Sequence, residues 1–187
     1  MIKVYGVHGS PYVRKVFIAL DIKDVPYEIV RQMPFSEDAE YLKINPLGKI
    51  PSLVDGDLTL CDSKVICQYL DDAYPEPRLY PTRPNDWARA LWYEDLAGGR
   101  VSELAASIFF QRFMRPLAFK QEPDEELIAR IIEKDLPPML DYLESQIPMG
   151  RFIFDDFMMA DLSIASPFIN AIQALGNRAY AQNGAVD

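Results

Sequence analysis

Apolar positions along the first 75 residues follow two different spacings. Ile2–Tyr5 and Tyr27–Val30 are short apolar runs of the kind that form strands. Between these runs, Ser10 and Pro11 stand where a helix begins, because Ser is a favoured N-cap and Pro is favoured at the first helical position. A helix that connects two strands in this way predicts a parallel strand pair. The apolar residues of this helix recur at intervals of three and four positions and so share one face: Val13, Val16, Phe17 and Leu20.

Residues 45–63 predict a hairpin that leads directly into a helix. Two short apolar runs flank Asp55-Gly56-Asp57, where glycine supplies the positive φ that a tight turn needs. Pro51 stands at the start of the first strand, where its missing N–H leaves no gap in the sheet, and the Ile50–Pro51 bond is a candidate for the cis form. Asp62-Ser63 ends the hairpin and opens the helix. Two interpretations remain open at this point: an ordinary hairpin with an ordinary helix cap, or a docking site for a small peptide-like anion.

Two further helices complete the first part of the chain, a short one at Glu37–Ile44 and a longer one at Ser63–Tyr74. The predicted order of elements is therefore β-α-β-α-β-β-α. Four prolines follow between positions 75 and 84, and such a proline-rich segment is typical of a linker. We therefore expect two domains, at residues 1–77 and 86–187, with a linker at residues 75–85.

Only helical spacing follows the linker, so the second domain is predicted to be all-helical. Its helices should be disturbed at Gly98-Gly99, Pro137-Pro138 and Pro167, because Gly weakens a helix and Pro removes one of its hydrogen bonds. Residues 179–187 are polar and show no pattern. The expected helices are Trp87–Met114, Glu122–Gln146 and Met159–Leu175.

The bulk properties of the chain narrow the classes of function. With 187 residues, 49% of them apolar and 25% charged, the composition is that of a globular protein. The net charge of −9 argues against nucleic acid or an anionic membrane as a main partner. No apolar run is long enough to span a bilayer, and the start of the chain reads as a strand rather than as a signal segment. We expect a cytoplasmic protein that binds neither nucleic acid nor membrane.

The two cysteines and the single histidine limit the possible chemistry. Cys61 and Cys67 are six positions apart, so they form no CxxC pair and lack the further ligands of a usual metal site. We predict no metal site, and we interpret both thiols as small buried apolar groups. His8 is interpreted as a loop residue. The alternatives are oxidation of Cys61, or a mixed disulfide between Cys61 and a small thiol, and a general base at His8.

Four short motifs follow one another along the chain: Ser10–Val16, Asn45–Pro51, Leu60–Ser63 and Ala160–Leu162. Together with the predicted order of elements, they resemble the cytosolic glutathione S-transferase family, in its serine-type, bacterial-like form. The resemblance covers nearly the whole chain. It implies an α+β protein of two domains: a thioredoxin-like N-terminal domain that binds glutathione, and an all-α C-terminal helical bundle. It also implies a homodimer, with Trp87–Met114 as the expected interface.

The resemblance implies that Ser10 lies beside the sulfur of glutathione. The physical case is that Ser10 offers a hydroxyl donor at a helix N-terminus, where free N–H groups and the helix dipole favour an anion. A thiolate is such an anion, and a lowered thiol pKa increases the population of this nucleophilic form. Ser10 would therefore stabilise the thiolate without being the nucleophile. A plain N-cap is the alternative.

Five other residues are implied to hold the rest of the glutathione molecule. The backbone of Ile50, beside a cis Pro51, would pair with the cysteinyl part. Ser63 would hold the γ-glutamyl carboxylate and Asp62 the α-ammonium group. Lys49 would lie near the glycyl carboxylate. For Asp62 and Ser63, simple helix capping is the alternative.

The resemblance implies an enzyme that adds the glutathione thiolate to a small hydrophobic electrophile bound between the two domains. Serine at position 10 favours this chemistry over disulfide exchange through that residue. Two alternatives are a non-catalytic binding or regulatory protein of the same family and a glutathione-dependent isomerase or disulfide-acting enzyme. One departure from the family pattern is Met158, which stands where a Ser or Thr usually caps the helix that contains Asp161, so a weaker cap is expected.

Overall fold

Strand β1 (Ile2–Gly6) lies inside a four-stranded sheet of order β2-β1-β3-β4 in the computed structural model, which describes residues 1–183. It pairs in parallel with β2 (Tyr27–Arg31) on one side and antiparallel with β3 (Ser52–Asp55) on the other. The outer strand β4 (Leu58–Cys61) pairs antiparallel with β3 across the Gly56 turn, where φ is +59°. The predicted parallel pair and the predicted hairpin are both confirmed.

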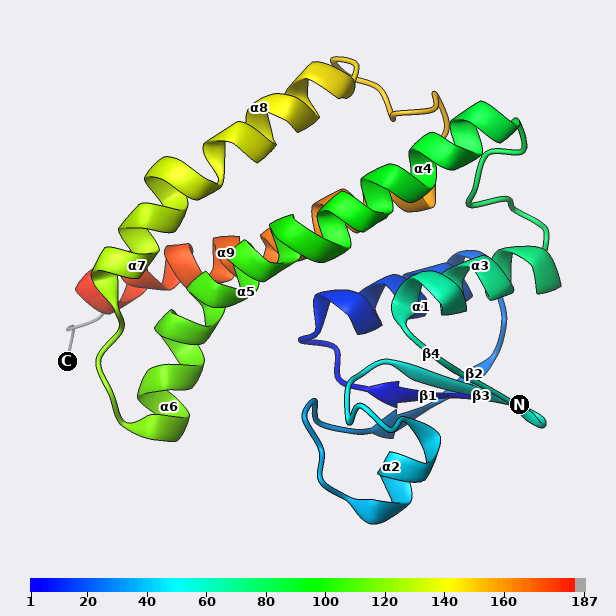
Figure 1. Cartoon of the computed structure of the whole chain (residues 1–187), viewed down its shortest axis with the longest axis horizontal. Helices are drawn as coiled ribbons and strands as arrows, with labels where there is room; N and C mark the ends of the chain where they lie inside the picture. Colours follow the sequence, from blue (N-terminus) through cyan, green and yellow to red (C-terminus); the bar gives the residue numbers. More distant parts are fainter. Residues whose placement is uncertain (184–187) are drawn as a thin grey trace.

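Three helices pack on this sheet (Figure 1). Helices α1 (Pro11–Ile22) and α3 (Ser63–Ala73) lie between the sheet and the helical domain, and the short α2 (Ala39–Ile44) lies on the opposite side of the sheet. The order β-α-β-α-β-β-α is therefore as predicted. It is the order of the thioredoxin-like domain, so the predicted fold class is confirmed for this part of the chain.

One long helical path begins after the linker. Its α-helical pattern is disturbed at Gly98-Gly99, as predicted, but the path continues without a break. Helix α4 (Pro84–Leu96) continues through a π-helical turn, η1 (Ala97–Val101), into α5 (Ser102–Phe109). A second π-helical turn, η2 (Phe110–Met114), leads on to α6 (Arg115–Phe119). Two glycines cost a helix interior about 2 kcal/mol in propensity, and here the tertiary packing of the path against the last helix outweighs that cost.

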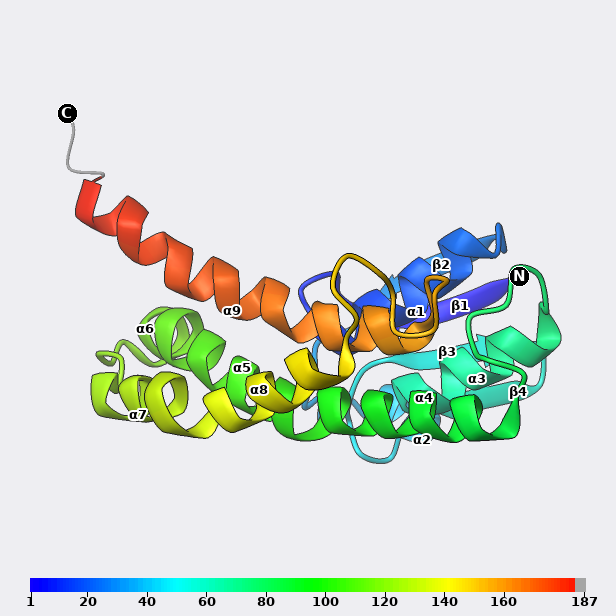
Figure 2. The ribbon, with the colours of Figure 1, turned by 90° about the horizontal axis from the view of Figure 1, so that it is seen from above.

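The remaining helices return along this path. Helix α7 (Glu125–Arg130) passes into η3 (Ile131–Asp135), and the chain then starts α8 (Pro137–Gln146) with both prolines in its first turn, so Pro137-Pro138 divides the predicted helix. The last helix, α9 (Met159–Asn183), contains Pro167 and continues beyond the predicted end at Leu175. Residues 179–183, which show no pattern in the sequence, therefore belong to this helix, and residues 184–187 lie outside the described part. Figure 2 shows α9 diverging from the other helices towards its end.

The start of α9 contains only one half of a capping box, as the sequence leads us to expect. Met158 lacks a capping hydroxyl, but the carboxylate of Asp161 accepts hydrogen bonds from the backbone N–H groups of Met158 and Ile153, each at 3.0 Å. The bond to Met158 is the half of a capping box that the acidic residue supplies. Asp161 therefore satisfies one N–H group at the helix start and also fixes the preceding loop.

The main core extends across both domains. It contains buried apolar residues of β1 and α1, such as Val4 and Val16, and continues into α4 and α9 through Tyr93 and Met159. A smaller cluster lies further along the helical domain, formed by Leu104, Ile108, Ile131, Leu136 and Ala174. Within residues 1–183, no helix is both long enough and apolar enough to cross a membrane.

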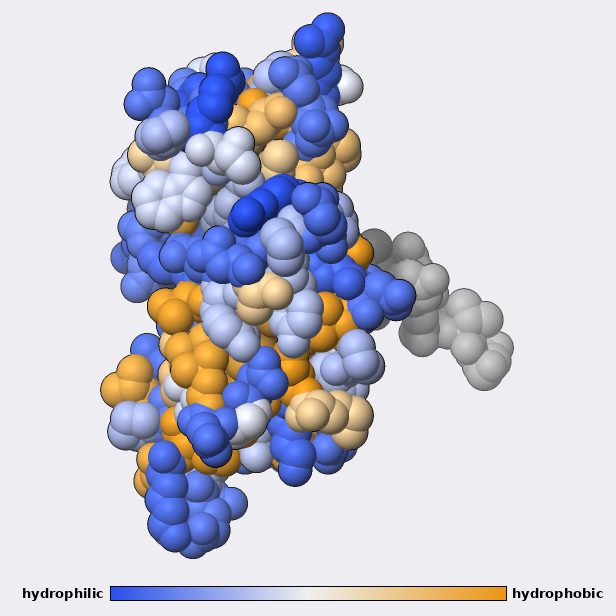
Figure 3. All heavy atoms as spheres, turned by 90° about the vertical axis from the view of Figure 1, so that its right-hand side faces the viewer, coloured by the Kyte–Doolittle hydropathy of each residue, from blue (hydrophilic) through white to orange (hydrophobic). Residues whose placement is uncertain are grey.

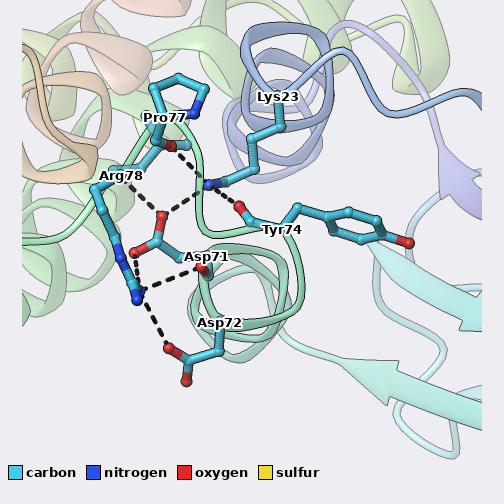
Figure 4. Close-up of polar contacts among 7 residues, drawn as sticks. Lys23, Asp71, Asp72, Tyr74, Pro77 and Arg78 are labelled. Carbon is cyan, nitrogen blue, oxygen red and sulfur yellow. Dashed lines mark hydrogen bonds and ion pairs between the residues drawn. The ribbon is translucent and has the colours of Figure 1, made fainter.

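A buried ion pair fixes the beginning of the linker (Figure 4). The ammonium of Lys23, at the end of α1, lies 2.8 Å from Asp71 Oδ1 on α3 and also donates to the carbonyl oxygens of Tyr74 and Pro77. Asp71 Oδ1 accepts a further bond from the N–H of Leu79, at 2.7 Å. These contacts connect α1, α3 and the linker, and so hold the chain in place where it leaves the first domain.

Candidate functional site

Three turns that carry the predicted site residues meet at one edge of the sheet. Tyr5 of β1 pairs with Ser52 of β3, and Ser52 pairs with Cys61 of β4. The end of β1, the start of β3 and the end of β4 therefore lie at the same level. The chain segments that contain Ser10, Pro51 and Asp62 adjoin these three strand ends, so register alone brings them to a common edge.

Ser10 is the N-cap of α1, as predicted. Its backbone is extended and its Oγ accepts from the N–H of Val13 at 3.4 Å, which is long for a hydrogen bond. Its own N–H donates to the carbonyl of Val7 at 3.1 Å. The side chain is partly exposed, so the hydroxyl hydrogen is free to be donated to a ligand at the helix N-terminus.

Two buried polar side chains support the loop before β3. The sequence did not predict this role for either of them. Tyr41 donates its hydroxyl to the carbonyl of Lys49 at 2.5 Å, and Asn45 donates to the same carbonyl at 2.8 Å. Burial raises the pKa of the Tyr41 hydroxyl, so it stays a donor. The Ile50–Pro51 bond is cis and both residues are buried, whereas the Lys49 side chain is exposed. The only local signal for this support was the polar residue Asn45 directly before Pro46.

The start of α3 combines strain with capping. Asp62 has φ +87° and ψ 125°, a region that non-glycine residues rarely occupy. Its exposed carboxylate accepts from the N–H of Lys64 at 2.8 Å. Ser63 is 4% exposed, and its hydroxyl has no hydrogen-bond partner among the described side chains and backbone. This pair therefore presents a carboxylate and an unengaged hydroxyl at a helix N-terminus, where an anion is favoured.

Two other candidates near Ser10 have structural contacts. The hydroxyl of Tyr12 donates to the carbonyl of Gly98 at 2.9 Å, so it joins α1 to the π-helical turn η1. His8 is exposed, and its ring lies 4.9 Å from the ring of Phe17. The interpretation of His8 as a loop residue agrees with this position. The contact of Tyr12 with Gly98 in the other domain was not predicted from the sequence.

The two cysteines differ in their surroundings. Cys67 is fully buried, and burial raises the pKa of its thiol to about 12. Cys61 is partly exposed, and its thiol donates to the carbonyl of Ile44 at 3.3 Å. Within the described residues, no three His, Cys, Asp or Glu side chains are grouped as metal ligands would be.

The aromatic residues of the long helical path do not form one group. Phe109 and Phe113 stack at 4.9 Å and pack on the smaller apolar cluster. Phe110 is 42% exposed and lies 5.9 Å from the ring of Phe119. Phe109 and Phe113 therefore contribute to the packing of the smaller apolar cluster. Met33 and Phe35, in the loop after β2, are exposed.

The chain is similar in sequence to known glutathione S-transferases and GST-like proteins. Residues 4–78 match the family model described as "Glutathione S-transferase, N-terminal domain". The chain is 30% identical over 187 residues to the uncharacterized GST-like protein YibF of Escherichia coli, an alignment that covers 99% of this chain and 87% of that protein. It is also 42% identical over 84 residues to a glutathione S-transferase of Arabidopsis thaliana, covering 43% of this chain and 38% of the plant protein.

Solved structures of glutathione transferases are similar to this chain over most of its length. A glutathione transferase from Populus trichocarpa superposes with a TM-score of 0.81 at 29% identity, covering 93% of this chain and 83% of that one. A glutathione S-transferase from Rhodospirillum rubrum gives a TM-score of 0.82 at 26% identity, covering 93% and 79%. The likeness therefore includes the helical domain as well as the sheet.

Proposed function

The chain belongs to the glutathione S-transferase family, and from this premise we propose that it binds glutathione at the sheet edge beside Ser10 and transfers it to a small hydrophobic electrophile. The observation that carries the proposal is the strand register, which brings the turns of Ser10, Pro51 and Asp62 to one edge. Each turn offers a different polar group there: a hydroxyl, a backbone segment and a carboxylate.

Ser10 acts on the sulfur. Its hydroxyl donates a hydrogen bond to the glutathione thiolate, and the N-terminus of α1 adds a favourable dipole. The sulfur lone pair then forms a carbon–sulfur bond with the electrophile, whose leaving group departs with the bonding electrons, and the thiol proton goes to solvent. Ser10 stays unmodified throughout, so its role is electrostatic.

The other five residues hold the peptide. The backbone of Ile50 beside Pro51 pairs with the cysteinyl part, and Lys49 attracts the glycyl carboxylate. Ser63 donates its unengaged hydroxyl to the γ-glutamyl carboxylate, and Asp62 accepts from the α-ammonium group. The buried support of the Lys49 carbonyl by Tyr41 and Asn45 keeps this segment in place before glutathione arrives.

We further propose domain limits of 1–77 and 86–187, with the second substrate between the domains, and a homodimer. Figure 3 shows the face that lies at the right of Figure 1, and apolar residues gather in its lower part, over the N-terminal domain. Leu58 and Val65 of this domain and Trp87 and Trp92 of α4 are between 37% and 50% exposed. Pairing of the N-terminal domain of one copy with α4 of another would cover side chains of both groups.

The test measures glutathione binding and conjugation to a generic aryl halide. For Ser10→Ala we expect kcat to fall roughly 10- to 100-fold, since a hydrogen bond to a charged group contributes about 1.5–3 kcal/mol, while glutathione still binds. Ser145→Ala is the matched control, because Ser145 is exposed on α8 and bonds only within its helix. No glutathione binding at millimolar concentration would refute the proposal. Unchanged turnover in Ser10→Ala would remove Ser10 from the mechanism.

A further inference from the structure

The backbone carbonyls on both sides of Ser10 are bound by polar side chains. The carbonyl of Gly9 accepts from Asn170 Nδ2 at 2.8 Å, and that of Pro11 accepts from Ser166 Oγ at 2.8 Å. Both donors belong to α9, so they come from the C-terminal domain. The carbonyl of His8 accepts a longer bond from Arg14, at 3.5 Å. Three anchor points, at residues 8, 9 and 11, thus lie on both sides of the proposed catalytic serine.

Arg14 fixes the orientation of the two α9 side chains. Both terminal nitrogens of its guanidinium lie 3.1 Å from Asn170 Oδ1. One of them also lies 2.8 Å from the carbonyl oxygen and 3.3 Å from the Oγ of Ser166. A guanidinium only donates, so the oxygen of the Asn170 amide must face Arg14 and its nitrogen must face Gly9. The direction of the bond to the loop is therefore determined by the network itself.

These contacts are shielded from water. Asn170 is 5% exposed and Ser166 is 1% exposed. A hydrogen bond in such surroundings is stronger than at the surface, and a partner left alone there carries a desolvation cost. The buried network can therefore restrain the loop more strongly than exposed hydrogen bonds of similar geometry would.

The loop needs such a restraint. It runs from Gly6 to Ser10 and contains a second glycine, Gly9, around whose Cα there is open space. Glycine loses more conformational freedom on ordering than any other residue. A hydroxyl that must meet a sulfur at hydrogen-bond distance tolerates little displacement. Local bonds connect Ser10 to Val7 and Val13, and the bonds from α9 add restraint on both sides of the serine.

We propose that Asn170 and Ser166, oriented by Arg14, are positioning residues for Ser10, so that the C-terminal domain sets the geometry of the serine in the N-terminal domain. The inference rests on the proposed function. It assigns α9 a part in thiolate stabilisation, in addition to its packing against α1. The three side chains do not touch glutathione; they act only through the backbone of residues 8–11.

Asn170→Ala and Ser166→Ala are the informative variants, because both side chains are neutral. Replacing Arg14 would also remove a positive charge near the thiolate, and the two effects could not be separated. Asp95→Asn is the control: Asp95 of α4 pairs with Lys64 of α3 at 2.5 Å, so it also joins the domains but touches no residue of the Ser10 loop.

The experiment titrates the ultraviolet absorbance of the glutathione thiolate bound to the full chain and measures kcat and KM. In Asn170→Ala we expect the thiolate fraction near neutral pH and kcat to fall roughly three- to tenfold, as expected for loss of one hydrogen bond. KM for glutathione should change less than about twofold, because its anchoring residues are untouched. Ser166→Ala should show the same pattern with a smaller effect, and it serves if Asn170→Ala does not fold. Asp95→Asn should match the wild type.

The possible outcomes distinguish a failure of the proposed function from a failure of the positioning role of Asn170 and Ser166. If wild-type protein shows no bound thiolate, the proposed function fails and this inference fails with it. If the wild type titrates but Asn170→Ala and Ser166→Ala titrate identically to it, only the positioning role is overturned. It is also overturned if Asp95→Asn shifts the titration equally, since any loosening of the domains would then suffice.

Discussion

The ammonium of Lys23 lies 2.8 Å from the carboxylate of Asp71, and the two side chains are 0% and 4% exposed. All three ammonium protons have acceptors, since the carbonyl oxygens of Tyr74 and Pro77 lie at 2.6 and 2.8 Å. Without Lys23, the only cation left near the Asp71 carboxylate among the described residues is the partly exposed Arg78, 3.4 Å from Oδ2. Removal of one member of a buried pair typically costs 3–5 kcal/mol. Lys23→Met should therefore lower the free energy of unfolding by about 3–5 kcal/mol, measured by urea denaturation.

Lys43→Met provides the control for this prediction. Lys43 pairs with Glu40 on α2, but the two side chains are 69% and 79% exposed. An exposed pair contributes only about 0.2–1 kcal/mol. If Lys23→Met and Lys43→Met lower the free energy of unfolding equally, burial does not increase the contribution of the Lys23–Asp71 pair to stability.

A second buried pair joins the two domains directly. Lys15 of α1 lies 2.9 Å from Glu94 of α4, with exposures of 3% and 0%. Glu94 also accepts from the hydroxyls of Tyr80 and Ser163. Lys15→Met and Glu94→Leu should each destabilise the protein by about 3–5 kcal/mol, whereas the double variant, with no unpaired charge, should lie closer to the wild type than either single variant.

A double-mutant cycle in urea measures this coupling. Strict additivity of the two single losses would contradict the prediction, because it would mean that the two charges do not compensate each other. Tyr80 and Ser163 lose their acceptor in both variants that lack Glu94, so their contribution cancels in the coupling energy between Lys15 and Glu94.

The sequence predicted the sheet and its helices because those depend on local patterns. Val13, Val16, Phe17 and Leu20 define the buried face of α1 by their spacing, and all four are buried. The same spacing places Lys15 and Arg14 on the polar side, where solvent is expected. The C-terminal domain covers that side instead, and its matching groups lie 79 to 156 positions away. No local pattern can reveal such partners.

In the candidate site too, local patterns identify some residues, while others depend on contacts between distant segments. Ser10, Pro51 and Ser63 could be named because each stands at a local signal, a helix cap or a strand start. Their supports, Tyr41 and Asn170, carry no such signal, since their roles arise only when distant segments meet. The roles of the named residues towards glutathione stay predictions, whereas the two-domain α+β fold is confirmed.

The Cys67 thiol should make stability depend on pH. Burial raises its pKa from the usual 9.0 to about 12. Between these values the folded chain keeps the proton that the unfolded chain loses, so the unfolded state binds fewer protons and stability falls as pH rises. Each such group contributes a slope of about 1.4 kcal/mol per pH unit in that window.

Comparison with Cys67→Ala isolates this contribution. The free energy of unfolding of the wild type should fall more steeply between pH 9.0 and 12 than that of the variant, and the two slopes should agree below pH 9.0. Parallel curves across the whole range would show that the thiol does not titrate differently in the folded and unfolded states.

We expect Asp62 to lower the stability of the fold through its strained backbone and to bind glutathione through its carboxylate. A non-glycine residue in a rarely populated conformation costs about 1–3 kcal/mol, and Asp62 has φ +87°. Glycine relieves that strain but adds freedom to the unfolded chain. Asp62→Gly should therefore raise the free energy of unfolding by roughly 1 kcal/mol, while loss of the carboxylate weakens glutathione binding roughly tenfold or more, as expected for a charged hydrogen bond.

Two further variants separate the causes. Asp62→Asn keeps the conformation and a capping oxygen, so it should lose affinity without gaining stability. Asp24→Gly relieves a positive φ of 52° in the turn after α1, and it should leave glutathione affinity unchanged because it lies outside the proposed site. Unfolding in urea and calorimetric titration with glutathione give both quantities on the same samples. If Asp62→Gly binds glutathione as tightly as the wild type, the carboxylate does not hold the α-ammonium group, and the strain at this position would need a purely structural cause.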